Sequence, residues 1–119
     1  MDVYFIRHGQ TDGNIALRHQ HADTPINRLG KLQAESVARK VAKIRPTNIV
    51  TSTNLRAVET TKIIIEKCGN LSPETHPAFE ELRRPSWLTG NHFVSFTTVL
   101  YILRWFFGFK IKGNGESYE

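Results

Sequence analysis

Val3-Tyr4-Phe5-Ile6-Arg7-His8-Gly9-Gln10-Thr11 is an apolar run that ends abruptly in an arginine, a histidine and a glycine. Aromatic and β-branched residues favour a strand, and a run that is apolar on both faces is typical of the buried centre of a parallel sheet. Loops at the carboxyl ends of parallel strands form the ligand crevice of open α/β folds. The segment therefore predicts an α/β fold with a parallel sheet, and it puts His8 at the edge where ligands bind.

The residues that end this run suit anion chemistry. Arg7 offers a planar cation that can grip phosphate or carboxylate, and the imidazole of His8 can act as a nucleophile or base near neutral pH. Gly9 allows a sharp turn or the close approach of a ligand. The alternative interpretation is a strand whose polar end only meets water.

Size and composition indicate one globular domain. The chain has 119 residues, of which 39% are hydrophobic and 23% are charged. These values are ordinary for a soluble globular domain, and we expect residues 1–119 to form one domain. A single cysteine, Cys68, excludes an internal disulfide and fits a reducing compartment, so we expect a cytoplasmic location. The N-terminus enters the first strand without a basic region ahead of it, so we expect no signal peptide.

The net charge of +5 narrows the class of ligand. The basic residues are spread along the chain, and no nucleic-acid-binding motif accompanies them. We interpret the charge as a favourable field for small anionic ligands, and we expect no nucleic-acid partner.

The chain that follows the first strand predicts a loop and a helix. Residues 10–27 form a long polar connection, and long loops in compact domains are usually functional. Asn27 is a good N-cap for a helix over 28–44 with one apolar face, and Arg45-Pro46 ends it.

A second strand over 48–52 leads directly into a helix over 54–67, which carries Arg56 in its first turn. The order of the first strand, the helix over 28–44 and this second strand implies that the two strands form a parallel pair with a right-handed crossover. Residues 74–79 form a third strand at the edge of the sheet in this interpretation, because Pro77 limits its pairing. Helix N-termini attract anions, so Arg56 adds a charge to a dipole that points at the crevice beside His8.

The segment 93–109 is strongly apolar but is interrupted by polar residues. It is shorter than the about 20 apolar residues that a transmembrane helix needs. We therefore predict a helix that covers the domain and no stable membrane insertion, with association at a membrane surface as the alternative.

Several motifs, in the same order along the chain, resemble those of the histidine phosphatase superfamily, the phosphoglycerate mutase-like fold. The family opens with R-H-G-x-T-x-x-N, and this chain matches each fixed position. The matching elements are Arg7-His8-Gly9-Gln10-Thr11 with Asn14, Asp23-Thr24-Pro25-Ile26, Gly30-Lys31-Leu32-Gln33-Ala34, Ser52 with Leu55-Arg56-Ala57 and Thr60, and Phe79-Glu80-Glu81.

The resemblance implies a parallel-sheet three-layer α/β sandwich and a phosphatase or mutase that works through a phosphohistidine on small phosphorylated metabolites. It implies that His8 is the nucleophile and that Glu81 donates a proton to the leaving oxygen. It assigns the phosphate oxygens to Arg7, Asn14 and Arg56, and it requires no metal or other cofactor. Charge neutralisation by two arginines and a helix N-terminus suits phosphoryl transfer. The oligomeric state stays open.

Each of these residues has a structural alternative. Glu80 and Glu81 could form a solvated acidic pair, and we prefer Glu81 over Glu80 as the acid. Asn14 could cap a turn, and Arg56 could lie on an exposed helix face, where ion pairs contribute little. The remaining histidines are assigned to the surface or to structure, except that the spacing of His19 and His21 also suits a metal pair without an evident third ligand.

The chain departs from the family in one respect. The family completes its phosphate pocket with a second histidine in an S-H-G-like turn after a later strand, and the sequence reaches Glu119 without one. The resemblance therefore covers about the N-terminal two-thirds of the family domain, a fold incomplete at the C-terminus. The sequence predicts either a histidine phosphatase or a catalytically impaired anion-binding fragment.

Overall fold

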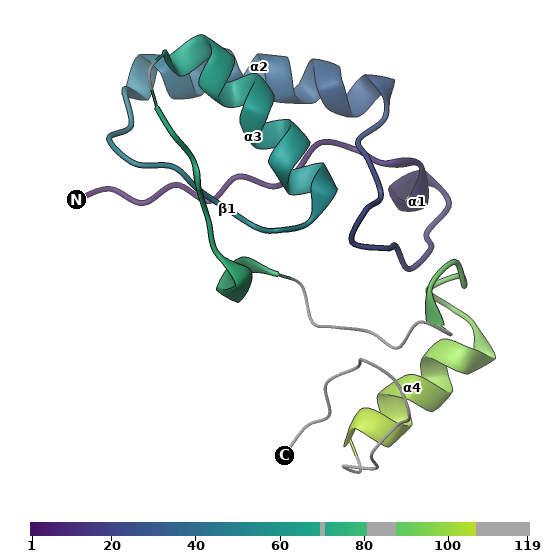
Figure 1. Cartoon of the computed structure of the whole chain (residues 1–119). Coiled ribbons are helices and arrows are strands. Elements are labelled where there is room, and N and C mark those ends of the chain that lie inside the picture. Colours follow the sequence, from purple (N-terminus) through teal and green to yellow (C-terminus); the bar gives the residue numbers. More distant parts are fainter. Residues whose placement is uncertain (70, 81–87, 107–119) are drawn as a thin grey trace. The chain divides into compact units, whose positions relative to one another are not determined.

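The computed structural model describes residues 1–69, 71–80 and 88–106 (Figure 1). Its elements follow the order α1 (Asp12–Ile15), α2 (Arg28–Ile44), β1 (Val50–Thr51), α3 (Leu55–Cys68), β2 (Glu74–Thr75), the 3₁₀ helix η1 (Pro77–Phe79) and α4 (Phe96–Phe106). The chain divides into two compact units. The first unit comprises Met1–Asp12 and Ala22–Phe79, and the second comprises Gly13–His21 and Glu80–Glu119.

Helices α2 and α3 pack against each other and form the core of the first unit (Figure 1). Ala38 is fully buried and clusters with Val41 and Ile64. Small side chains on α2 let the two helix backbones approach, and the apolar positions recur at helical spacing. The predicted helices over 28–44 and 54–67 are confirmed to within one residue.

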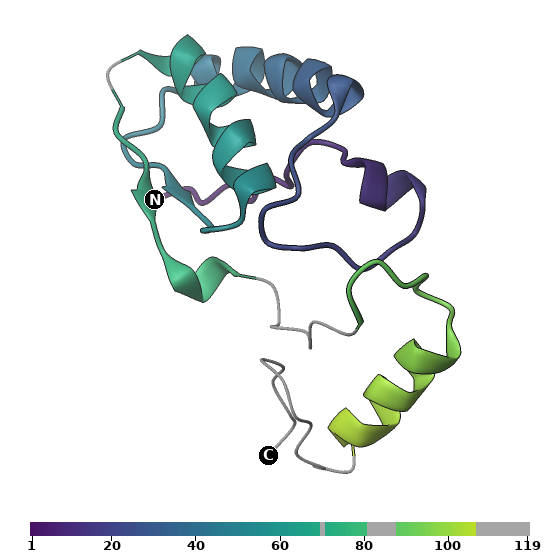
Figure 2. The same ribbon diagram turned by 45° about the vertical axis from the view of Figure 1, so that its right-hand side comes forward.

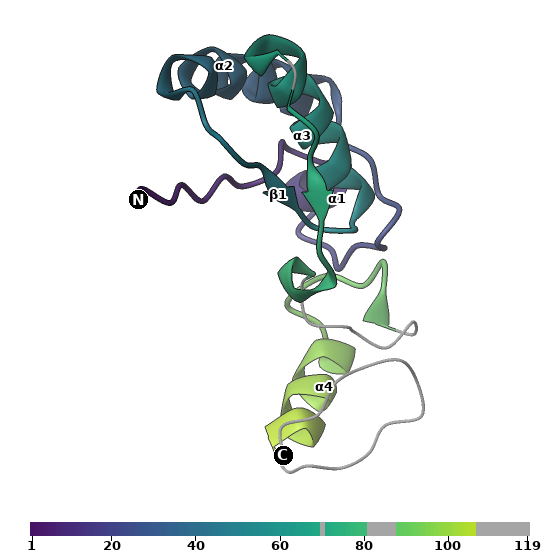
Figure 3. The ribbon, with the colours of Figure 1, turned by 60° about the vertical axis from the view of Figure 1, so that its left-hand side comes forward.

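The sheet of the first unit is a parallel pair, β1 and β2 (Figure 3). Val50 pairs with Glu74 and Thr51 with Thr75, while α3 makes the crossover between them. The prediction of a parallel sheet is confirmed, but the pair that forms joins the second and third predicted strands rather than the first and second, and both strands are shorter than expected. Pro77 begins η1 and so ends the second strand, because proline has no N–H to donate to a ladder.

The prediction of a buried N-terminal strand is wrong. Residues 3–6 belong to no strand, and the side chain of Phe5 is 87% exposed. The segment passes near β1 in both Figure 1 and Figure 3, yet among the described residues the only sheet joins β1 to β2. Aromatic and β-branched residues favour an extended backbone, but a strand also needs a neighbour that pairs with its N–H and C=O groups.

The second unit is built around α4 and the loop that begins it. Ser95 starts the helix by accepting a hydrogen bond from the N–H of Thr98, at 3.2 Å. Arg18 and His92 form an isolated antiparallel bridge, with the N–H of Phe93 donated to the carbonyl of Leu17 at 2.7 Å. The helix confirms the prediction of helical structure within 93–109. That it covers the domain stays a prediction.

In the part of the chain that the structure describes, none of the helices has the length and apolar character needed to cross a membrane. The expectation of one domain over residues 1–119 also stays a prediction.

Candidate active site

The ring of His8 is held by the backbone next to it. Its Nδ1 lies 2.7 Å from the carbonyl oxygen of Gly9, and the side chain is half-buried. A carbonyl oxygen can only accept, so Nδ1 carries the hydrogen and donates it. The other ring nitrogen, Nε2, therefore carries the lone pair, which makes it the nucleophilic atom of the neutral imidazole.

Gly9 is fixed from three directions. Its carbonyl accepts a hydrogen bond from the His8 ring, and its buried N–H donates to the hydroxyl oxygen of Thr60 at 3.0 Å. Its Cα faces α2. A Cβ built on Gly9 would lie 2.4 Å from the carbonyl oxygen of Gly30 and within 3 Å of two further Gly30 backbone atoms. The turn after His8 thus rests backbone to backbone on the first turn of α2, and only glycine fits there.

The next residue anchors the same turn to α2. The N–H of Gln10 donates to the side-chain oxygen of Gln33 at 2.9 Å, and its carbonyl accepts from the N–H of Asn27 at 2.8 Å. Asn27 also caps α2, since its side chain accepts from the N–H of Gly30 at 2.9 Å. The motif that begins at Gly30 and includes Gln33 is therefore the support on which the His8 turn is built.

Arg56 lies in the first turn of α3 and is 3% exposed. The interpretation that places it on an exposed helix face is wrong. The Thr60 hydroxyl donates to the carbonyl oxygen of Arg56 at 2.7 Å and accepts from the N–H of Gly9. One hydroxyl thereby joins the turn that carries Arg56 to the turn that carries His8, and Figure 2 shows the N-terminal segment running past the first turns of α3.

The loop before α2 is tied to α3 as well. The side chain of Glu59 accepts from the N–H of Ile26 at 2.8 Å, and the N–H of Leu55 donates to the carbonyl of Ala22 at 2.8 Å. Ile26 is buried. The segment 23–26, matched to the family at the sequence level, thus packs against the helix that carries Arg56.

The structure gives less information on the other predicted site residues, Arg7, Asn14 and Glu81. Arg7 is exposed beside His8 in the first unit. Asn14 belongs to α1 and to the second unit, where its carbonyl accepts from the N–H of Leu17 at 3.3 Å. Glu81 lies outside the described residues, whereas Glu80 is described and half-buried. Within the first unit, the structure brings together the segments that carry Arg7, His8 and Arg56.

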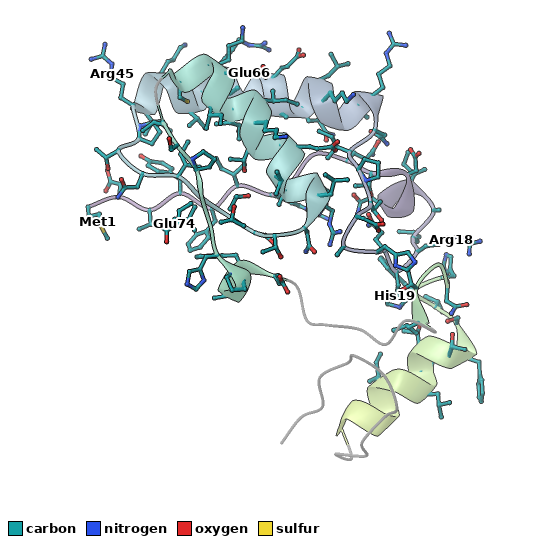
Figure 4. The ribbon with its side chains drawn as sticks, in the orientation of Figure 1. Met1, Arg18, His19, Arg45, Glu66 and Glu74 are labelled. Carbon is teal, nitrogen blue, oxygen red and sulfur yellow. The ribbon has the colours of Figure 1, made fainter. Side chains whose placement is uncertain are left out.

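His19 contacts Thr98 and Phe93, which belong to the same second unit (Figure 4). The hydroxyl of Thr98 donates to the carbonyl of His92 at 3.1 Å, so it accepts from Nε2 of His19, at 3.0 Å. The His19 ring also packs on Phe93, with the ring centroids 4.8 Å apart. Among residues 1–69, 71–80 and 88–106, no three His, Cys, Asp or Glu side chains gather where they could hold a metal ion, and the structure gives the pairing of His19 with His21 no support.

Sequence reasoning did not single out Thr60, Gly30, Gln33 or Glu59 as site residues. Gly30, Gln33 and Thr60 belong to motifs already quoted, and Glu59 lies between Ala57 and Thr60 of one of them. Membership of these motifs was the available signal. The partners of Gln33, Glu59 and Thr60 lie 23, 33 and 51 residues away in the sequence, and no local pattern reports such pairings.

This chain is similar to known proteins in sequence and in fold. A relative named "Probable phosphoglycerate mutase GpmB", from Yersinia pestis, is 40% identical over 83 residues, which are 69% of this chain and 38% of that protein. A solved mycobacterial glucosyl-3-phosphoglycerate phosphatase in complex with VO3 is 32% identical, with a TM-score of 0.67 over 82% of this chain and 49% of that one.

A second solved structure, TTHB049 from Thermus thermophilus, is 27% identical, with a TM-score of 0.67 over 94% of this chain and 61% of that one. The chain thus spans between 38% and 61% of the length of these proteins. Its α/β fold is that of the phosphoglycerate mutase-like phosphatases. The family model for the histidine phosphatase superfamily (branch 1) matches residues 3–119, so this protein belongs to that superfamily.

Proposed function

We propose that this protein hydrolyses small phosphomonoesters by way of a phosphohistidine on His8. Arg7, Asn14 and Arg56 bind the phosphoryl oxygens, and Glu81 is the proton donor. The observation that carries the proposal is the bond from Nδ1 of His8 to the Gly9 carbonyl, at 2.7 Å. It leaves the lone pair of Nε2 available for attack without a separate base.

The charge near His8 suits the reaction. Phosphoryl transfer is catalysed mainly by positioning and by neutralising charge on the three equatorial oxygens. Arg56 is buried in the first turn of α3, where the helix dipole already favours an anion. A buried guanidinium with planar donors binds tetrahedral oxyanions well. A solved relative holds VO3, whose three oxygens correspond to the three equatorial oxygens of a phosphoryl group in transfer, and this supports the same use here.

The proposed reaction has two steps. In the first, Nε2 of His8 forms a bond to phosphorus while the bond from phosphorus to the ester oxygen breaks, and Glu81 protonates the leaving oxygen. In the second, the carboxylate of Glu81 takes a proton from water as that water attacks phosphorus and the N–P bond breaks. Inorganic phosphate leaves, and His8 and Glu81 return to their starting protonation states. A mutase would use the same steps with a metabolite hydroxyl in place of water.

The second candidate is anion binding without turnover. The 119 residues contain Arg7, His8 and Arg56 but no Ser-His-Gly turn that would supply a second histidine. This candidate predicts that inorganic phosphate binds while phosphomonoesters are not hydrolysed.

Incubation of the full chain with a ³²P-labelled phosphomonoester separates the two candidates. Hydrolysis through His8 predicts acid-labile, base-stable label on the wild-type protein and none on His8→Ala. His76→Ala is the matched control, because His76 is exposed and its Nδ1 only accepts the N–H of Ala78. Phosphate binding without any label supports the anion-binding candidate. Label that persists in His8→Ala overturns the proposed nucleophile.

A further inference from the structure

The hydroxyl of Thr60 has two different partners that both belong to the site. The side chain is 4% exposed, and it lies one turn after Arg56 on α3. Its oxygen donates to the carbonyl of Arg56 at 2.7 Å and accepts the N–H of Gly9 at 3.0 Å. A hydroxyl has one hydrogen and two lone pairs, so both bonds are satisfied by the same group.

We propose that Thr60 is a positioning residue that sets the nucleophile His8 against Arg56, an inference that rests on the proposed function. The connection is continuous. The His8 ring bonds to the carbonyl of Gly9, the N–H of Gly9 bonds to Thr60, and Thr60 bonds to the backbone of Arg56. Gly9, Thr60 and Arg56 are all buried, so water does not replace these bonds readily.

The connection matters because the transfer needs alignment between nucleophile and phosphorus. A misplacement of about 1 Å at a reacting group can cost a factor of about 100 in rate. The contact with Gly30 limits the movement of Gly9 toward α2, but it does not link Gly9 to Arg56. Among the described contacts, the Thr60 hydroxyl is the one that connects the backbone beside the nucleophile to the backbone of the buried arginine.

The next residue on the helix offers a matched control. Thr61 is also buried, and its hydroxyl also makes a buried hydrogen bond, but it donates to the hydroxyl of Thr51 at 3.0 Å on β1. Thr61→Val therefore removes a buried hydroxyl of the same kind from the same helix. It leaves the bond between Gly9 and Thr60 in place.

Three variants of the full chain test the inference: Thr60→Val, Thr60→Ser and Thr61→Val. Valine keeps the shape of threonine but leaves the N–H of Gly9 without its acceptor, whereas serine keeps the hydroxyl. We expect Thr60→Val to bind inorganic phosphate about tenfold more weakly and to label His8 about 10- to 100-fold more slowly. Thr60→Ser and Thr61→Val should stay close to wild type in both measurements.

The ¹⁵N spectrum of the His8 imidazole provides a readout that does not depend on phosphoryl transfer. In wild type, Thr60→Ser and Thr61→Val, the hydrogen should reside on Nδ1, and in Thr60→Val the signals should shift toward a mixture of tautomers. Unchanged His8 signals in Thr60→Val, or equal changes in Thr60→Val and Thr61→Val, overturn the inference. If wild type neither binds phosphate nor becomes labelled, the proposed function fails, and these spectra still decide whether Thr60 positions His8.

Discussion

The first turns of α2 and α3 are built in opposite ways. At α2, Asn27 accepts the N–H of Gly30 and closes the helix with a side-chain cap. At α3, Asn54 stands at the same position but makes no side-chain capping bond within the described residues. The first turn of α3 instead carries the buried Arg56. One helix start therefore supports the chain, whereas the other buries a cation in its first turn, where we propose that an anion binds.

The support at α2 is tested most severely by Gly9→Ala. The added methyl would meet the backbone of Gly30 at 2.4 Å, and backbone atoms cannot turn away as a side chain does. We expect a loss of about 3 kcal/mol in the free energy of unfolding, the upper end for overpacking. Urea denaturation measures this loss. Gly69→Ala serves as the comparison for chain packing, since a Cβ there meets nothing within 4 Å, although its positive φ adds a cost of its own. Equal stability of Gly9→Ala and wild type would contradict the close contact.

The cation at α3 is tested by Arg56→Ala. Hydrogen bonds between an arginine and an oxyanion contribute about 1.5–3 kcal/mol, so we expect phosphate to bind about 10- to 100-fold more weakly. Arg56→Lys keeps the charge but loses the planar fork of donors. Its affinity for phosphate should therefore lie between those of the wild type and Arg56→Ala. Isothermal titration with inorganic phosphate gives both values, and circular dichroism checks that the variants fold. Wild-type affinity in Arg56→Ala would remove Arg56 from the site.

Substitutions at the two N-cap positions, Asn27 and Asn54, should have smaller effects on the free energy of unfolding. Asn27→Ala should lower the free energy of unfolding by about 1 kcal/mol, because it removes the bond to Gly30 N–H. Asn54→Ala should change it by less than about 0.5 kcal/mol, as expected where no side-chain cap is lost. Thermal denaturation of the two variants side by side provides the measurement. A larger cost at Asn54 would reverse the assignment of the two helix starts.

The sequence predicted helices α2 and α3 and the parallel direction of the sheet, but not which strands pair, because helix and turn signals are local. Asn27, the apolar spacing of α2 and the proline at Pro77 each act within a few residues. The strand at residues 3–6 failed for the opposite reason. Its composition favours extension, but pairing depends on a partner strand that composition does not specify.

The same contrast between local and long-range signals applies to the residues of the candidate site. Arg7, His8 and Arg56 stand out in the sequence because charge and imidazole chemistry are visible in residue type. Thr60 was not predicted as part of the site, because its role depends on a bond to Gly9 across 51 residues. Asn14 and Glu81 stay predictions, the first in the second unit and the second outside the described residues.

The nitrogen of His8 that takes the phosphoryl group tests the central claim most directly. Because Nδ1 donates to the carbonyl of Gly9, the phosphoryl group should attach to Nε2. Trapping the labelled full chain under alkaline, denaturing conditions and recording its ³¹P spectrum against the two phosphohistidine isomers identifies the atom. The account predicts the Nε2 isomer on His8. The Nδ1 isomer, or label on another residue, would contradict it.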